Sequence, residues 1–133
     1  MKIHSVQTKL QAGQIVNSIG QYLYKHIDTA YNMKKSPNTV DVYFEIAYEL
    51  LPEYRLNKGD EETHVMSINI NITTYQDKIR VNVIEVSPEE RTLGFDTFKL
   101  DVFENMSEGM ELVLAKVRNR MKKAFTEYEF YFG

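Results

Sequence analysis

Apolar residues recur every three or four positions over residues 9–31, which predicts an amphipathic helix. Thr8 and Gln11, three positions apart, fit a capping box at the start of this helix. Gly13 and Gly20 would each weaken a helix by about 1 kcal/mol relative to alanine. Their presence therefore indicates that a neighbouring element packs closely against the helix.

A second apolar stripe, from Met110 to Tyr128, predicts a helix near the end of the chain. Asn105 or Ser107 can cap its first turn, because both side chains accept hydrogen bonds from backbone N–H groups. Residues 1–6 are short and partly alternating, and we expect them to form a strand before the first helix.

Alternation of apolar and polar residues predicts four strands between the helices, over residues 39–51, 66–73, 78–83 and 97–102. The second and third form a β-hairpin that turns near Gln76 and Asp77. The alternation slips at Val83 and Ile84, which indicates a bulge or the end of a strand. Loop-forming residues fill the segments 32–38, 53–62 and 87–94.

The predicted fold class is α+β, in one domain that spans residues 1–133. An antiparallel sheet of four to five strands carries two amphipathic helices on one face, in the order (β)-α-β-β-β-β-α. The other face of the sheet is polar, as is common where an antiparallel sheet meets solvent.

Composition excludes several classes of protein. Hydrophobic residues make up 43% of the chain and charged residues 26%, as in ordinary globular domains. The net charge of −3 disfavours a protein that mainly grips a phosphate backbone. There is no cysteine, signal-peptide pattern or long apolar span, so we expect a cytoplasmic protein without a membrane segment.

No reactive constellation stands out in the sequence. Without cysteine there is no thiol nucleophile and no cysteine zinc site, and no nucleophile-elbow, P-loop or dinucleotide-binding motif is present. His4, His26 and His64 are not spaced to share a metal, and His26 is expected to be a half-buried structural residue. We therefore expect no enzyme activity, no catalytic residues, no metal and no cofactor.

The one strongly basic segment is KVRNRMKK, near the end of the second helix. It holds five cations: Lys116, Arg118, Arg120, Lys122 and Lys123. Cations late in a helix complement its dipole, and their aliphatic stems can cover the edge of a core. The functional alternative is that the five bind nucleic acid or the ribosome.

The polar sheet face is the stronger candidate for binding a protein partner. It is predicted to display Tyr43, Asn69, Asn71, Arg80 and Asn82. Only Tyr43 and Tyr75 are predicted to offer rings for stacking on RNA bases, so a wet protein–protein interface is favoured.

The chain ends on EYEFYFG, an aromatic run that includes Phe130, Tyr131 and Phe132. A strand here would add to a sheet edge of the same chain or of another, and we expect docking within the same fold. Because apolar side chains also point away from the helix stripes, we expect a homodimer in which these three residues take part.

If residues 1–6 form a strand, the element order resembles the β-α-β-β-β-α arrangement of ribosome hibernation factors, which implies a ribosome-binding role. The residues themselves favour a small non-catalytic interaction or assembly module. Accessory proteins of phages and mobile elements are often of this kind.

Overall fold

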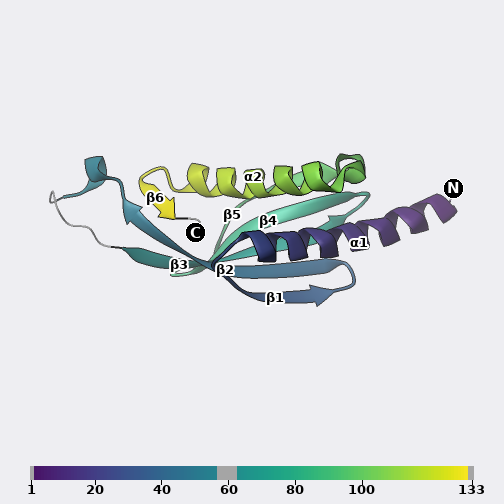
Figure 1. Cartoon of the computed structure of the whole chain (residues 1–133), viewed down its shortest axis with the longest axis horizontal. Helices are drawn as coiled ribbons and strands as arrows, with labels where there is room; N and C mark the ends of the chain where they lie inside the picture. The colour runs from purple at the N-terminus through teal and green to yellow at the C-terminus, as the bar shows by residue number, and fades with distance from the viewer. Residues whose placement is uncertain (1, 57–62, 132–133) are drawn as a thin grey trace.

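The structure is a computed structural model that describes residues 2–56 and 63–131, with side chains for 11–56 and 63–130. It is an α+β fold with an antiparallel sheet and two long helices (Figure 1). In chain order the elements are α1 (Lys2–His26), β1 (Ala30–Ser36), β2 (Thr39–Leu50), the 3-10 helix η1 (Pro52–Tyr54), β3 (His64–Tyr75), β4 (Lys78–Ser87), β5 (Arg91–Lys99), the 3-10 helix η2 (Leu100–Glu104), α2 (Met106–Ala124) and β6 (Tyr128–Tyr131).

The strands lie in the order β1-β2-β3-β4-β5, and every neighbouring pair is antiparallel. The twelve-residue β2 is long enough to hold two partners one after the other along its outer edge. β1 pairs with its first half, up to Phe44, and β6 pairs with the stretch from Ala47 to Leu50. The first and last strands of the chain therefore share one side of β2.

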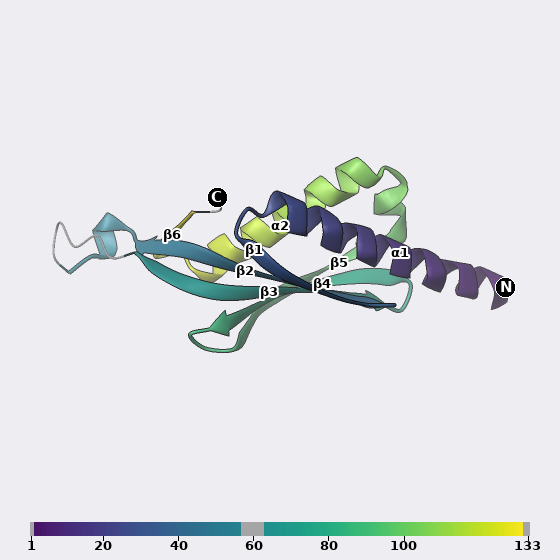
Figure 2. The same cartoon turned by 60° about the horizontal axis from the view of Figure 1, so that its bottom comes forward.

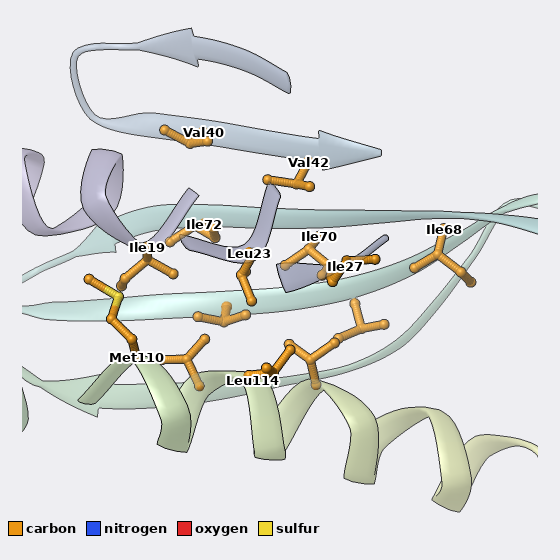
Figure 3. Packing of buried hydrophobic residues seen from close by; sticks show 14 of the residues in the cluster. Ile19, Leu23, Ile27, Val40, Val42, Ile68, Ile70, Ile72, Met110 and Leu114 are labelled. Carbon is orange, nitrogen blue, oxygen red and sulfur yellow. The ribbon is translucent and has the colours of Figure 1, made fainter. Parts of the chain in front are cut away.

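Both helices cover the same face of the sheet, and no element of residues 2–56 and 63–131 lies across the opposite face (Figure 2). The core lies between the helices and the covered face. Ile19 and Leu23 of α1 lie beside the isoleucines of β3, and Leu114 of α2 belongs to the same buried cluster (Figure 3). Ile68, Ile70 and Ile72 are fully buried, and burial of each such side chain contributes about 2 kcal/mol.

The close packing predicted from the glycines of the first helix is confirmed. A Cβ built on Gly20 would lie 2.3 Å from Cγ1 of Val40, and one on Gly13 would lie 2.9 Å from the carbonyl oxygen of Pro37. These glycines let α1 approach the start of β2 more closely than any side chain would permit.

The predicted strand over residues 1–6 is wrong, since α1 already begins at Lys2. Thr8 therefore lies within the helix and is not its cap, and the order that resembles ribosome hibernation factors is absent. α1 also ends earlier than predicted, at His26. His26 is exposed, and its ring stacks on Tyr22 at 4.0 Å between centroids, so the expectation that it is half-buried is also wrong.

The loop predicted over residues 32–38 is mostly strand β1. Its residues are polar and largely exposed, so no alternation marks it, and pairing with β2 supplies its hydrogen bonds instead. β5 likewise begins at Arg91, inside a predicted loop, and ends at Lys99, where the chain enters η2. The positive φ of Gly94, 127°, belongs to the bulge in the β4–β5 pairing that the slip at Val83 predicted.

Two other local predictions are confirmed. Tyr75 pairs with Lys78 across a two-residue turn in which Gln76 has a φ of 56°, so β3 and β4 form the expected hairpin. Asn105 caps α2, because its side-chain oxygen accepts a hydrogen bond from the backbone N–H of Glu108 at 3.2 Å.

Candidate interface on the open face of the sheet

The uncovered side of the sheet, here called the open face, is built from the residues that alternate with the core residues of each strand. The open face carries Asn32, Lys34 and Ser36 of β1, Thr39, Asp41, Tyr43 and Glu45 of β2, Ser67, Asn69, Asn71, Thr73 and Tyr75 of β3, Lys78, Arg80, Asn82 and Ile84 of β4, and Thr92, Phe95, Thr97 and Lys99 of β5. The alternation follows from the two-residue period of a strand, which sends neighbours to opposite faces. All five predicted partner-binding residues of the sheet lie here.

A chain of hydrogen bonds crosses the middle of the open face. Oδ1 of Asp41 accepts from the side-chain amides of Asn71 at 2.8 Å and Asn69 at 3.3 Å, and Asn82 donates to Oδ1 of Asn71 at 3.4 Å. The chain joins β2, β3 and β4, and it holds each amide in one orientation. Asn69 is only 6% exposed, so its hydrogen bond to Asp41 offsets the loss of water around a buried amide.

The guanidinium of Arg80 is stacked between two aromatic rings. Its Cζ lies 3.7 Å from the ring centroid of Tyr75 and 4.5 Å from that of Phe95. Both rings are close to half exposed, at 41% and 47%. The Nε atom of Arg80 is buried and has no hydrogen-bond partner within the described chain, which costs free energy that the two cation–π contacts offset.

Tyr43 forms a second aromatic site on the opposite half of the open face. The ammonium of Lys34 lies 5.5 Å from the centroid of its ring. Burial, and then the nearby carboxylate of Asp41, raises the pKa of Tyr43, so its hydroxyl keeps its proton and can donate a hydrogen bond at neutral pH.

Sequence reasoning missed Phe95, which was assigned next to a loop. Phe95 pairs with Asn82 in the regular part of the β4–β5 register, before the bulge, and this pairing places it on the open face. A usable signal was present in the sequence, because Phe95, Thr97 and Lys99 alternate with the buried Phe98.

The basic segment of α2 lies on the helix side of the sheet, away from the open face. Nε and Nη2 of Arg120 donate to both carboxylate oxygens of Asp96, at 2.9 and 3.0 Å, and Nη2 also donates to the carbonyl of Phe95 at 2.8 Å. These hydrogen bonds, aided by the charges of Lys116 and Lys123, hold the pKa of Asp96 below its ordinary value. Arg120 is thus engaged in joining α2 to the edge of β5. Lys116, Arg118, Lys122 and Lys123 are exposed.

The tail docks within the same fold, as expected, through strand β6. The partly buried ring of Phe130 contacts Phe125 and Tyr48, with centroids 5.4 and 6.0 Å apart, and Tyr128 joins the same cluster. Beside it, Arg91 pairs with the buried carboxylate of Glu85 and stacks on Phe125. The side chain of Tyr131, and all of Phe132, lie outside the described residues.

A hollow of about 510 Å³ lies between the end of α2 and β6, and neither His26 nor His64 lines it. Its lining residues are Leu51, Lys122, Phe125, Thr126, Tyr128, Glu129 and Phe130. Among the side chains of residues 11–56 and 63–130, no three His, Asp or Glu groups are placed to hold a metal ion. Within residues 2–56 and 63–131, no helix combines the length and apolar character that crossing a bilayer requires.

No protein-family model, curated protein or solved structure matches this chain. Its function must therefore be inferred from its own side chains.

Proposed function

We propose that this protein is a non-catalytic interaction or assembly module that binds a protein partner through the open face. The observation that carries the proposal is the stack of Tyr75, Arg80 and Phe95, in which two half-exposed rings hold a guanidinium in place. Together with tryptophan, tyrosine and arginine are the residue types enriched at the energetic centres of protein interfaces.

The open face is also held in one conformation before any partner arrives. Asp41 orients the amides of Asn69 and Asn71, and the two rings orient Arg80. Side chains that are already ordered lose less conformational entropy on binding, which raises affinity without additional contacts. Amides that donate and accept along the same surface suit a polar, hydrated interface.

Nucleic-acid binding through α2, the alternative from the sequence, is less well supported. Arg120 already uses its Nε and Nη2 donors on Asp96 and on the backbone of β5. Gel-shift assays with RNA and DNA at two salt concentrations test this alternative, because phosphate contacts weaken steeply as salt rises.

Affinity capture from the source cells tests the proposed function. Three forms of the protein are compared: the natural chain, Phe95→Ser on the open face, and Leu112→Ser, which replaces a similarly exposed apolar residue on α2. A partner that is lost with Phe95→Ser and kept with Leu112→Ser supports the open face. A partner that Phe95→Ser retains, or that Leu112→Ser loses, contradicts it.

A further inference from the structure

The cross-strand register arranges the open face in rows that run from β1 to β5. One row contains Lys34, Asp41, Asn71, Asn82 and Phe95, each opposite the next in the pairing of neighbouring strands. The central residue of the row, on β3, is uncharged. The charged Lys34 and Asp41 lie on one side of it, and the amide of Asn82 and the ring of Phe95 lie on the other.

The β3 residue is also uncharged in the two neighbouring rows. One contains Asn32, Tyr43, Asn69, Ile84 and Thr92, and the other contains Ser36, Thr39, Thr73, Arg80 and Thr97. In all three rows the β3 residue is an amide or a hydroxyl, which can both donate and accept a hydrogen bond. The acids Asp41 and Glu45 lie on β2, whereas Lys78 and Arg80 lie on β4.

This pattern is complementary to itself about β3. If two copies face each other across a two-fold axis that runs along β3, each β3 residue faces its own copy, and β2 faces β4. In the first row Asn71 then meets Asn71 of the second copy, and Asp41 meets an amide donor, Asn82. At the ends of that row the ammonium of Lys34 meets the ring of Phe95.

The other rows fit equally well. Tyr43 faces Ile84, Thr39 faces Arg80, and the β3 residues Asn69 and Thr73 face their own copies. None of these three rows places two like charges opposite each other. Such a repulsion would occur twice in a two-fold dimer, so its absence favours this packing.

We propose that the occupant of the open face is a second copy of this chain, packed sheet to sheet about a two-fold axis along β3. The inference rests on the proposed function and names its partner. Two sheets packed this way are aligned within about 30°, so the rows near the centre keep these partners. The tail is then not the centre of the dimer, since Phe130 packs within its own protomer.

The size of the open face is sufficient for a stable dimer. Five strands about 4.8 Å apart, with nine residues of roughly 3.3 Å each as in β5, span roughly 700 Å². Standard stable interfaces cover about 600–1,000 Å² per partner, so the open face falls within this range.

Two substitutions of Asn82 test the axis, because they are expected to act in opposite directions. Asn82→Asp places a carboxylate opposite Asp41 of the second copy, twice in the dimer, and should raise the dissociation constant at least tenfold. Asn82→Lys places a cation there and should lower it. Loss of fold or of a local hydrogen bond would weaken the dimer in both variants. The readout is sedimentation velocity over a concentration series, with thermal unfolding as a check on folding.

A crosslinking experiment tests the axis independently and perturbs the fold little. The natural chain has no cysteine, so a single introduced thiol reports on itself. Ser67→Cys on β3 should be joined to its own copy by a short bis-maleimide, because residues on the axis face themselves. Thr97→Cys, on the same face but on β5, faces Ser36 of the second copy and should give little crosslinked dimer.

Several results would overturn the inference. A monomer at about 100 μM, a dimer that both Asn82 variants weaken alike, or equal crosslinking of the two cysteine variants excludes the proposed packing. Binding of a single-stranded oligonucleotide by the monomer, lost in Arg80→Glu, would assign the open face to nucleic acid and overturn the proposed function as well. A monomer whose captured protein partner is lost only with Phe95→Ser refutes the second copy and leaves the proposed function standing.

Discussion

Replacement of Gly20 by alanine should destabilise this protein, although the same change stabilises most helices. In an exposed helix interior alanine is favoured over glycine by about 1 kcal/mol. Here the new Cβ would lie 2.3 Å from Cγ1 and 3.1 Å from Cβ of Val40. Carbon atoms pack favourably at about 3.5–4.0 Å, so the overlap exceeds roughly 1 Å.

Val40 cannot easily move out of the way. It is fully buried on β2, and its branched side chain has few accessible rotamers. Overpacking of this kind costs about 1–3 kcal/mol, and sometimes more. A clash of about 2 kcal/mol exceeds the gain in helix propensity of about 1 kcal/mol. We therefore expect Gly20→Ala to lower the free energy of unfolding by about 1 kcal/mol and Tm by about 4 °C.

A double-mutant cycle with Val40→Ala isolates the contact. Val40→Ala alone removes two buried carbons, which costs about 1.6 kcal/mol plus a cavity contribution. In the double variant the Cβ introduced at position 20 enters the space that Cγ1 leaves. The two changes together should therefore cost about 2 kcal/mol less than their sum, well outside the roughly 0.5 kcal/mol within which independent sites add.

Urea unfolding followed by circular dichroism measures all four proteins of the cycle. Gln21→Ala and Gln21→Gly, at the neighbouring exposed position of α1, give the propensity difference in the same helix without the contact. If Gly20→Ala stabilises the protein by the amount that separates those two controls, or if the cycle is additive, the close approach of α1 to β2 is refuted.

Three further substitutions test individual contacts. Asp96→Asn removes the acceptor of Arg120 and should cost about 1 kcal/mol at pH 7, since both side chains are partly exposed. Because folding lowers the pKa of Asp96, this contribution is complete above an unfolded pKa of about 4 and is lost as pH falls through the folded value. The difference between the urea midpoints of the two proteins should therefore shrink as the pH is lowered below about 4, and a pH-independent difference contradicts the pairing. Phe130→Ala should cost about 2 kcal/mol by emptying part of the cluster around Tyr48, whereas an unchanged midpoint would show that the tail does not contribute to the core. Asn105→Ala should cost about 1 kcal/mol through loss of the α2 cap, and calorimetry that shows no change in Tm would exclude that capping bond.

The periodicity of the sequence by itself determined the core of this fold. Residues 39–50 alternate with a period of two, and the stripe from Met110 repeats with a period near 3.6, because each element must bury one face. The hairpin turn at Gln76, the bulge after Val83 and the cap at Asn105 were also predictable, because each is specified by a few neighbouring residues.

Local pattern also placed much of the open face. Asn69, Asn71, Arg80 and Asn82 alternate with buried residues on β3 and β4, so their common side follows from the strand period alone. The hydrogen bonds among these side chains did not follow from the strand period. The hydrogen bonds from Asn69 and Asn71 to Asp41 depend on the register between β2 and β3, which residues far apart in the chain decide together.

Only the tertiary structure decided the elements whose residues carry no pattern of their own. β1 is polar and largely exposed, so it is a strand because the edge of β2 offers it hydrogen bonds. β6 occupies the rest of that edge because β2 extends beyond the end of β1. The stack of Tyr75, Arg80 and Phe95 likewise exists only because three strands meet in one register. Such contacts join residues that are distant in sequence, and their energy appears only when the sheet is complete.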